Sequence, residues 1–288
     1  MSPLALLLVL TGAVLHATWN LSAKRAAGGD SVAFVWLMGL VSAGLALPFG
    51  LVSWVAGAPP LDALAWVAVA ASGVVHAVYF LLLQRGYRHG ALSVVYPVAR
   101  GTGPLFAVIA AVVLFGEQPG LLGSVGIAAI LAGIVLVSGL LQAPTADGRT
   151  ASIGWGALTG VWIATYTVID AWAVTSLGLG PVFFFALSLL VTASALAPFA
   201  LRDREAVRRE WLSARRQILV VGVLSPVAFT LVLFALRLAP LAYVAPLREV
   251  SMMVGVFYGA WVLHERVTAA RLAGVGCMVA GVAALALA

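Results

Sequence analysis

The chain has 288 residues, of which 63% are hydrophobic and 9% are charged, and its mean hydropathy is +1.12. A soluble domain carries roughly 25% charged residues, so this composition excludes an ordinary soluble protein and requires lipid around most of the surface. The formal net charge of +6 does not indicate nucleic acid, because the basic residues lie in short loops beside apolar runs, where they orient a membrane protein.

Apolar runs long enough to cross a membrane occur ten times along the chain. A hydrocarbon core of about 30 Å needs roughly 20 apolar residues per helix, and Gly, Pro and polar residues separate most of the runs. The first run is expected to be a retained span rather than a signal peptide, since no basic segment precedes it and further runs follow. We predict helices over residues 3–23, 32–56, 61–84, 91–115, 120–141, 152–173, 181–201, 216–237, 241–263 and 268–287.

Basic residues concentrate in the connections after odd-numbered runs, while the other connections and the termini contain only Arg237. The positive-inside rule therefore predicts a multi-pass membrane protein with the odd-numbered connections in the cytoplasm and both termini outside, which is the periplasm if the membrane is a bacterial inner membrane. The longest connection, Arg202 to Arg216, mixes apolar residues with Arg and Glu. It fits a short helix at the membrane interface, and it fits a solvated charged loop equally well.

The second half of the chain repeats the first at an offset of 148 residues. The matched pairs are Leu10-Thr11-Gly12 with Leu158-Thr159-Gly160, Arg100 with Arg248, Glu117 with Glu265, Gly126 with Gly274, and Ala132-Gly133 with Ala280-Gly281. The repeats would occupy residues 1–142 and 152–288, joined by a polar linker from Gln142 to Thr150.

Each half contains five predicted spans, so the second half must enter the membrane upside down. The sequence therefore predicts an all-α polytopic membrane protein with ten transmembrane helices, arranged as two inverted five-helix repeats. Inverted repeats are typical of secondary transporters, which bind substrate near the membrane midplane between the halves.

Short motifs recur at the same places in both halves. They are Gly90-Ala91-Leu92, Tyr96-Pro97 and Phe115-Gly116-Glu117 in the first half, and Tyr243-Val244-Ala245-Pro246, His264-Glu265 and the glycine-rich run from Gly274 to Gly281 in the second. With these motifs the whole chain resembles the EamA-type ten-helix transporters of the drug/metabolite transporter superfamily. Within that superfamily, aromatic amino-acid exporters of the YddG type are similar in length and aromatic content. The resemblance implies a central cavity surrounded by spans 1, 3, 4, 6, 8 and 9, with spans 5 and 10 outside it.

Two arginines lie deep inside predicted spans, where ionisable groups are costly and point to function. Arg100 and Arg248 are repeat mates and should straddle the midplane. Each guanidinium can bind a substrate carboxylate through two parallel hydrogen bonds. Alternatively, Arg100, Arg248 and Glu249 form a gating or structural ion pair, or the arginines snorkel towards the interface.

Three predicted spans carry polar and aromatic residues on one helical face. These faces contain His16, Trp19 and Asn20, then His76, Tyr79 and Phe80, then Trp162, Tyr166 and Asp170. They would line an amphipathic substrate cavity, or they would serve helix contacts and interfacial positions instead. Asp170 lies near the end of its span, so solvation alone would explain it. Glu117 and Glu265 are expected to act as polar helix stops.

We therefore expect a secondary transporter that exports small amphipathic metabolites by alternating access, with aromatic or hydrophobic amino acids as the first choice. A multidrug or cation exporter is the alternative, although span 1 has His16 and Asn20 where such proteins need an acid. An intramembrane enzyme is disfavoured, since the chain has no HExxH, GxSxG or nucleotide-binding motif, and the repeat disfavours a scaffold. We expect no catalytic residue, metal or cofactor. The expected partners are the substrate and the lipid bilayer, and a monomer is compatible with the sequence.

Overall fold

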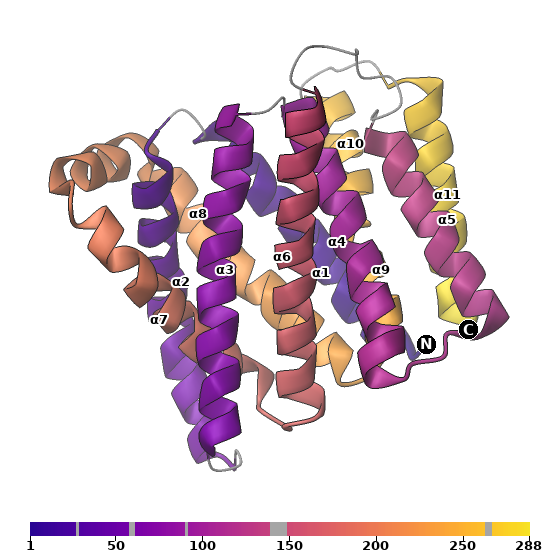
Figure 1. The fold of residues 1–288 in the computed structure, drawn as a ribbon, viewed down its shortest axis with the longest axis horizontal. Helices are drawn as coiled ribbons and strands as arrows, with labels where there is room; N and C mark the ends of the chain where they lie inside the picture. Colours follow the sequence, from indigo (N-terminus) through magenta and orange to yellow (C-terminus); the bar gives the residue numbers. More distant parts are fainter. Residues whose placement is uncertain (27–28, 58–60, 90–91, 139–148, 263–266) are drawn as a thin grey trace.

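The computed structural model of the protein describes residues 1–26, 29–57, 61–89, 92–138, 149–262 and 267–288, and these form helices without any strand (Figure 1). The helices are α1 (Pro3–Arg25), α2 (Ser31–Val55), α3 (Ala63–His89), α4 (Leu92–Phe115), α5 (Gly120–Ser138), α6 (Arg149–Thr175), α7 (Pro181–Ala200), α8 (Arg204–Leu236), α9 (Leu241–Arg248), α10 (Ser251–Val262) and α11 (Ala269–Leu287). In the described part of the chain, nine of them are each long and apolar enough to cross a membrane.

The predicted span over residues 241–263 is not one continuous helix, as we had expected, but two. α9 has 8 residues and α10 has 12, and the chain between them makes tight i to i+3 bonds, from the Glu249 amide to the Pro246 carbonyl (3.0 Å) and from the Met252 amide to the Glu249 carbonyl (2.8 Å). Pro246 lacks an amide hydrogen and crowds the preceding turn, so it weakens α9 just before the break. Broken helices at membrane depth are tolerated where they are buried in protein or line a cavity.

Other boundaries also differ from the prediction. The charged stretch after Arg202 is a helix, which is one of the two forms expected for it. It continues into the eighth span, so α8 begins at Arg204 rather than at the predicted residue 216, and it bends at Ala214 (φ −122°, ψ 16°). α3 extends to His89, beyond the predicted end at 84. α6 begins at Arg149, inside the predicted linker, and most of that linker lies outside the described residues.

The contact between α5 and α11 confirms that the repeats are inverted. A Cβ added at Gly281 would lie 2.7 Å from the carbonyl oxygen of Gly126, and one at Gly274 would lie 2.8 Å from that of Gly133. Gly126 and Gly274 are repeat mates at the 148-residue offset, and so are Gly133 and Gly281, so exchanging the two halves turns one contact into the other. Because the numbering rises along α5 as it falls along α11, the two helices are antiparallel. The axis that exchanges them therefore lies across the helices, in the membrane plane.

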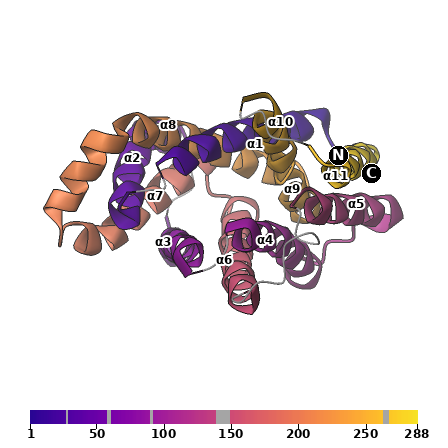
Figure 2. The ribbon, with the colours of Figure 1, turned by 90° about the horizontal axis from the view of Figure 1, so that it is seen from above.

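Three other helix pairs follow the same exchange. α1 packs on α8 as α6 packs on α3, and α2 packs on α7 near the axis (Figure 2). α5 and α11 lie together at one edge of the bundle, as the resemblance implied for spans 5 and 10. Both termini lie at the same end, with the amino group of Met1 3.5 Å from the Ala286 carbonyl, as an even number of crossings requires.

Replacing Gly274 with alanine is expected to destabilise the protein by about 1–3 kcal/mol, because the added methyl overlaps backbone that cannot move away cheaply. Its Cβ would lie 2.8 Å from both the Gly133 carbonyl oxygen and the Val137 nitrogen. Gly276, two residues later on the same helix, has no atom within 4 Å of the added carbon. Thermal unfolding in detergent should therefore separate Gly274→Ala from a near-neutral Gly276→Ala, and equal melting temperatures would contradict this packing.

Candidate functional site

The break between α9 and α10 faces the middle of α4 and brings four polar side chains together. Arg100 Nε lies 2.7 Å from Glu249 Oε2, and Arg100 Nη2 donates a hydrogen bond to Ser251 Oγ at 2.9 Å. Arg248 Nε lies farther away, 3.6 Å from Glu249 Oε1. Arg100, Arg248 and Glu249 are only 5%, 4% and 0% exposed. The cluster is therefore a charged site enclosed by protein.

The charges in this cluster do not balance. Two guanidinium groups share one carboxylate, so the cluster carries one net positive charge. Arg100 and Arg248 are repeat mates, but the position that corresponds to Glu249 is occupied by Gly101, so the acid belongs to one half alone. The two arginines differ in their distance from the shared acid, since Arg248 Nε at 3.6 Å is beyond hydrogen-bond range whereas Arg100 Nε at 2.7 Å is within it. A buried donor without an acceptor is costly.

Aromatic rings lie directly beside Arg248. Its guanidinium carbon lies 5.7 Å from the centre of the Tyr166 ring, within cation–π range. Tyr166 in turn stacks on His76 at 4.2 Å and lies 5.4 Å from Tyr79. Phe229 of α8 adjoins His76 at 5.8 Å and extends this aromatic wall. The site thus combines a cationic centre with apolar and π-rich surfaces.

The structure gathers most of the residues that the sequence singled out, and it buries them. Trp19 and His16 form an edge contact at 4.6 Å, and His16 reaches Phe229 at 6.2 Å. Asn20 is half-buried and donates to the His16 carbonyl of its own helix, while Trp162 is half-buried against the core. Most of these side chains are closed off from solvent in this arrangement. Their roles in binding remain predictions.

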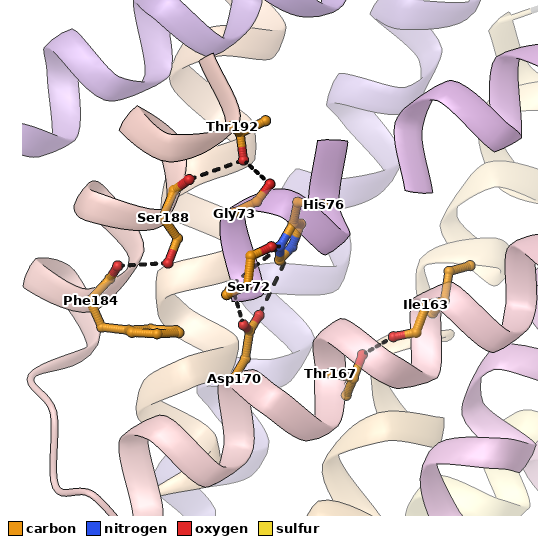
Figure 3. A network of polar contacts seen from close by, with 9 residues as sticks. All are labelled: Ser72, Gly73, His76, Ile163, Thr167, Asp170, Phe184, Ser188 and Thr192. Carbon is orange, nitrogen blue, oxygen red and sulfur yellow. Dashed lines mark hydrogen bonds and ion pairs between the residues drawn. The ribbon is translucent and has the colours of Figure 1, made fainter. Parts of the chain in front are cut away.

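The expectation that Asp170 is explained by solvation is wrong. Its side chain is 3% exposed and lies against α3, where Ser72 Oγ donates to Asp170 Oδ1 at 2.6 Å and His76 Nε2 lies 3.9 Å from Asp170 Oδ2 (Figure 3).

Among the described residues, no three His, Cys, Asp or Glu side chains gather as a metal site would require.

Sequence reasoning missed three residues of the site: Ser72, Phe229 and Ser251. Ser72 was within reach, because it precedes His76 by four residues and therefore lies on the same helical face. Phe229 and Ser251 are an ordinary phenylalanine and serine within apolar runs, and no local pattern marks them.

Glu117 does more than end a helix, contrary to expectation. Its two carboxylate oxygens accept hydrogen bonds from the amides of Leu241 and Ala242, both at 2.8 Å. These are first-turn amides of α9, which have no partners within the helix. Tyr243 supports the same junction by donating to the Pro119 carbonyl at 2.7 Å. The end of α4 therefore anchors the start of the broken helix. The repeat mate Glu265 lies outside the described residues.

Glu117→Gln is expected to cost about 1.5–3 kcal/mol, since charge-assisted hydrogen bonds are the strong ones and glutamine has one acceptor oxygen in place of two. Chemical unfolding in detergent measures the loss. Glu205→Gln is a suitable control, because Glu205 is 61% exposed and meets Arg208 only at 3.9 Å. Matching free energies of unfolding in the two variants would show that the Glu117 contacts contribute nothing.

Comparison with known proteins agrees with this architecture. The sequence profile of the EamA-like transporter family matches residues 3–139 and 150–287, one match in each half. No curated protein matches the chain. A solved structure described as "Crystal structure of protein" is similar with a TM-score of 0.79 over 98% of this chain and 96% of that one, at 16% identity, which supports the fold alone. The two profile matches, which cover nearly the whole chain, show that it is a multi-pass membrane protein of the EamA-like transporter family.

Proposed function

We propose that the protein is a secondary transporter for small amphipathic metabolites that carry a carboxylate, with aromatic or hydrophobic amino acids as the favoured substrates, and that it exports them by alternating access. The observation that carries the proposal is the pair of buried arginines that share one glutamate beside a wall of aromatic rings. The site lies within one chain, so a monomer suffices.

Arg248 is the residue proposed to bind the substrate carboxylate. Its planar guanidinium can offer two parallel N–H donors, and a carboxylate there neutralises the extra positive charge of the cluster. Tyr166 and Tyr79 lie beside it and offer the apolar area that an aromatic or aliphatic side chain needs. Amino acids satisfy both requirements in one small molecule.

Glu249 is the proposed gating partner. Its carboxylate lies between the two arginines but closer to Arg100 (2.7 Å) than to Arg248 (3.6 Å). When substrate occupies Arg248, Glu249 can remain paired with Arg100, so no charge is left unpaired. The burial of Arg248 supports an occluded starting state, from which the halves must separate on one side to admit substrate.

One observation favours the alternative of a cation exporter: Asp170 is a buried carboxylate inside a span, which such exporters need. The charge at the centre argues against it. A lipophilic cation brings no carboxylate for Arg248, and it would lie close to two guanidinium groups that share a single acid. Amino acids carry their own carboxylate and avoid that cost, so we place them first.

Flux measurements with purified protein in liposomes test the proposal. Labelled Phe, Trp and Met should enter faster than into protein-free liposomes, whereas a quaternary amine and a nucleotide sugar should not. Arg248→Gln is the matched control, since it leaves the Arg100–Glu249 pair in place but removes the proposed carboxylate-binding group. Movement of the amine or the nucleotide sugar without any amino acid would end the amino-acid assignment.

We also propose that the protein lies in a bacterial inner membrane with both termini in the periplasm, because basic residues cluster in the connections after odd-numbered spans. A C-terminal alkaline phosphatase fusion should then be active and a C-terminal fluorescent protein dark. Fusions placed after Arg202, in the connection between α7 and α8, should give the opposite pair of results. The reverse pattern at the two positions would invert the topology.

A further inference from the structure

Ser72, His76 and Asp170 form a buried polar cluster between α3 and α6 (Figure 3). His76 Nδ1 lies 2.9 Å from the Ser72 carbonyl oxygen. Ser72 Oγ donates to Asp170 Oδ1 at 2.6 Å, and His76 Nε2 lies 3.9 Å from Asp170 Oδ2. The cluster is not a product of the repeat, because the positions that correspond to His76 and Asp170 are Leu224 and Ser22.

An inventory of hydrogens shows that the cluster has room for one more proton. A carbonyl oxygen only accepts, so His76 Nδ1 must carry the hydrogen that it donates to Ser72. The single hydroxyl hydrogen of Ser72 is donated to Asp170. A neutral imidazole then turns the lone pair of Nε2 towards the Asp170 carboxylate. Nε2 has no hydrogen-bond partner among the described residues. It lies 3.9 Å from Oδ2, which is too long for a hydrogen bond, so a proton taken up by either group is shared only when the two side chains move closer.

A small cavity lies beside this buried pair. The cavity has a volume of about 20 Å³ and is lined by His76, by the hydroxyl-bearing residues Ser188, Thr192 and Ser225, and by apolar side chains of α2, α3, α7 and α8. Roughly 10–15 Å³ is enough to hold one water molecule. A water in this cavity would lie beside His76 and the hydroxyl oxygens of Ser188, Thr192 and Ser225, which can accept hydrogen bonds from it.

The charges around the pair connect it to the proposed substrate seat. The titratable and charged groups nearest the pair are Tyr166 on α6 and Arg248 on α9. Arg100 on α4 and His16 on α1 lie farther away. The helices α2 and α7 contain no Asp, Glu, His, Lys or Arg. The Tyr166 ring contacts both His76 (4.2 Å) and the Arg248 guanidinium (5.7 Å). Asp170 follows Tyr166 by four residues and so lies one turn away on the same face.

We propose that His76 and Asp170 bind one exchangeable proton, and that this proton is exchanged for the substrate during export. This inference rests on the proposed transport of amino acids. Without the proton the pair carries one negative charge, which attracts the substrate ammonium group while Arg248 binds the carboxylate. With the proton the pair is neutral and that attraction is lost. One proton therefore enters the cell for each substrate molecule that leaves, and no other bond is made or broken.

Liposomes that enclose a pH-sensitive dye test the exchange. An outward gradient of phenylalanine should drive protons inward through the wild-type protein, and phenylalanine exchange should slow as the pH falls. Asp170→Asn and His76→Gln should lose the proton movement and flatten the pH profile. Asp62→Asn is the control, since that carboxylate only caps α3 through the Ala65 amide at 2.7 Å. Phenylalanine movement by the wild type without proton movement would overturn the exchange.

Infrared difference spectra between acid and alkaline pH test the proton site without any transport. The wild type and Asp62→Asn should show a titrating signal from the buried pair, and Asp170→Asn should lose it. A missing signal in the wild type would overturn the site even if amino acids are transported. A present signal together with no amino-acid flux would leave the site standing and would refute the proposed substrate.

Discussion

Replacing Glu249 with glutamine is expected to lower the free energy of unfolding by about 3–5 kcal/mol, because removing one partner of a buried ion pair leaves uncompensated buried charge. Here two guanidinium groups, of Arg100 and Arg248, would lose the carboxylate that they share. Glutamine has nearly the same shape, so the loss reports charge rather than volume. Denaturant unfolding of the purified protein in detergent measures it.

Two further variants make the result specific. Arg248→Gln should cost less than Glu249→Gln, because it leaves the 2.7 Å pair between Arg100 and Glu249 intact and removes the excess charge. The double variant Arg100→Gln, Glu249→Gln should recover part of the loss, since contacting residues couple in double-mutant cycles. If Glu249→Gln is as stable as the wild type, the cluster does not depend on its carboxylate.

The second large effect concerns substrate affinity in Arg248→Lys. Lysine keeps the positive charge but loses the planar fork that binds a carboxylate through two bonds. Losing one charge-assisted hydrogen bond costs about 1.5–3 kcal/mol, or roughly 10- to 100-fold in apparent affinity. The loss should affect phenylalanine and spare phenylalaninamide, which lacks a carboxylate. Competition of each compound against labelled phenylalanine measures the two affinities.

Arg237→Lys is the matched control for this substitution. Arg237 caps the end of α8 and is exposed, so the same change of side chain there should leave both affinities unaltered. An equal loss of affinity for phenylalanine and its amide in Arg248→Lys would move Arg248 out of the carboxylate seat and into a structural ion pair.

The transmembrane spans and the inverted repeat could be predicted from the sequence, because apolar runs of membrane length and motifs that recur at one offset are both visible in it. Hydrophobic length identifies the spans, and the glycine pairs at the 148-residue offset proved to be the points where α5 and α11 touch. The break between α9 and α10 was missed. Pro246 signalled a disturbance there, but apolar composition continues across it, so hydropathy alone predicts one helix.

The polar contacts of the site were only partly predictable. Asp170 was expected to be solvated because it lies near the end of a predicted span. It is enclosed instead, because α3, about a hundred residues earlier in the chain, packs Ser72 against it. Glu117 likewise meets the first turn of α9, 124 residues away at Leu241. Such partners are set by the packing of two helices, and the pattern within either helix does not contain them.

Counterflow of labelled phenylalanine in liposomes that hold the purified wild-type protein tests the central claim most directly. Unlabelled phenylalanine on the opposite side should accelerate the exit of label, because the loaded site alternates between faces, whereas phenylalaninamide should not, because it lacks the carboxylate that Arg248 binds. Equal acceleration by both compounds, or by neither, would contradict a carboxylate-binding transporter built around the two arginines.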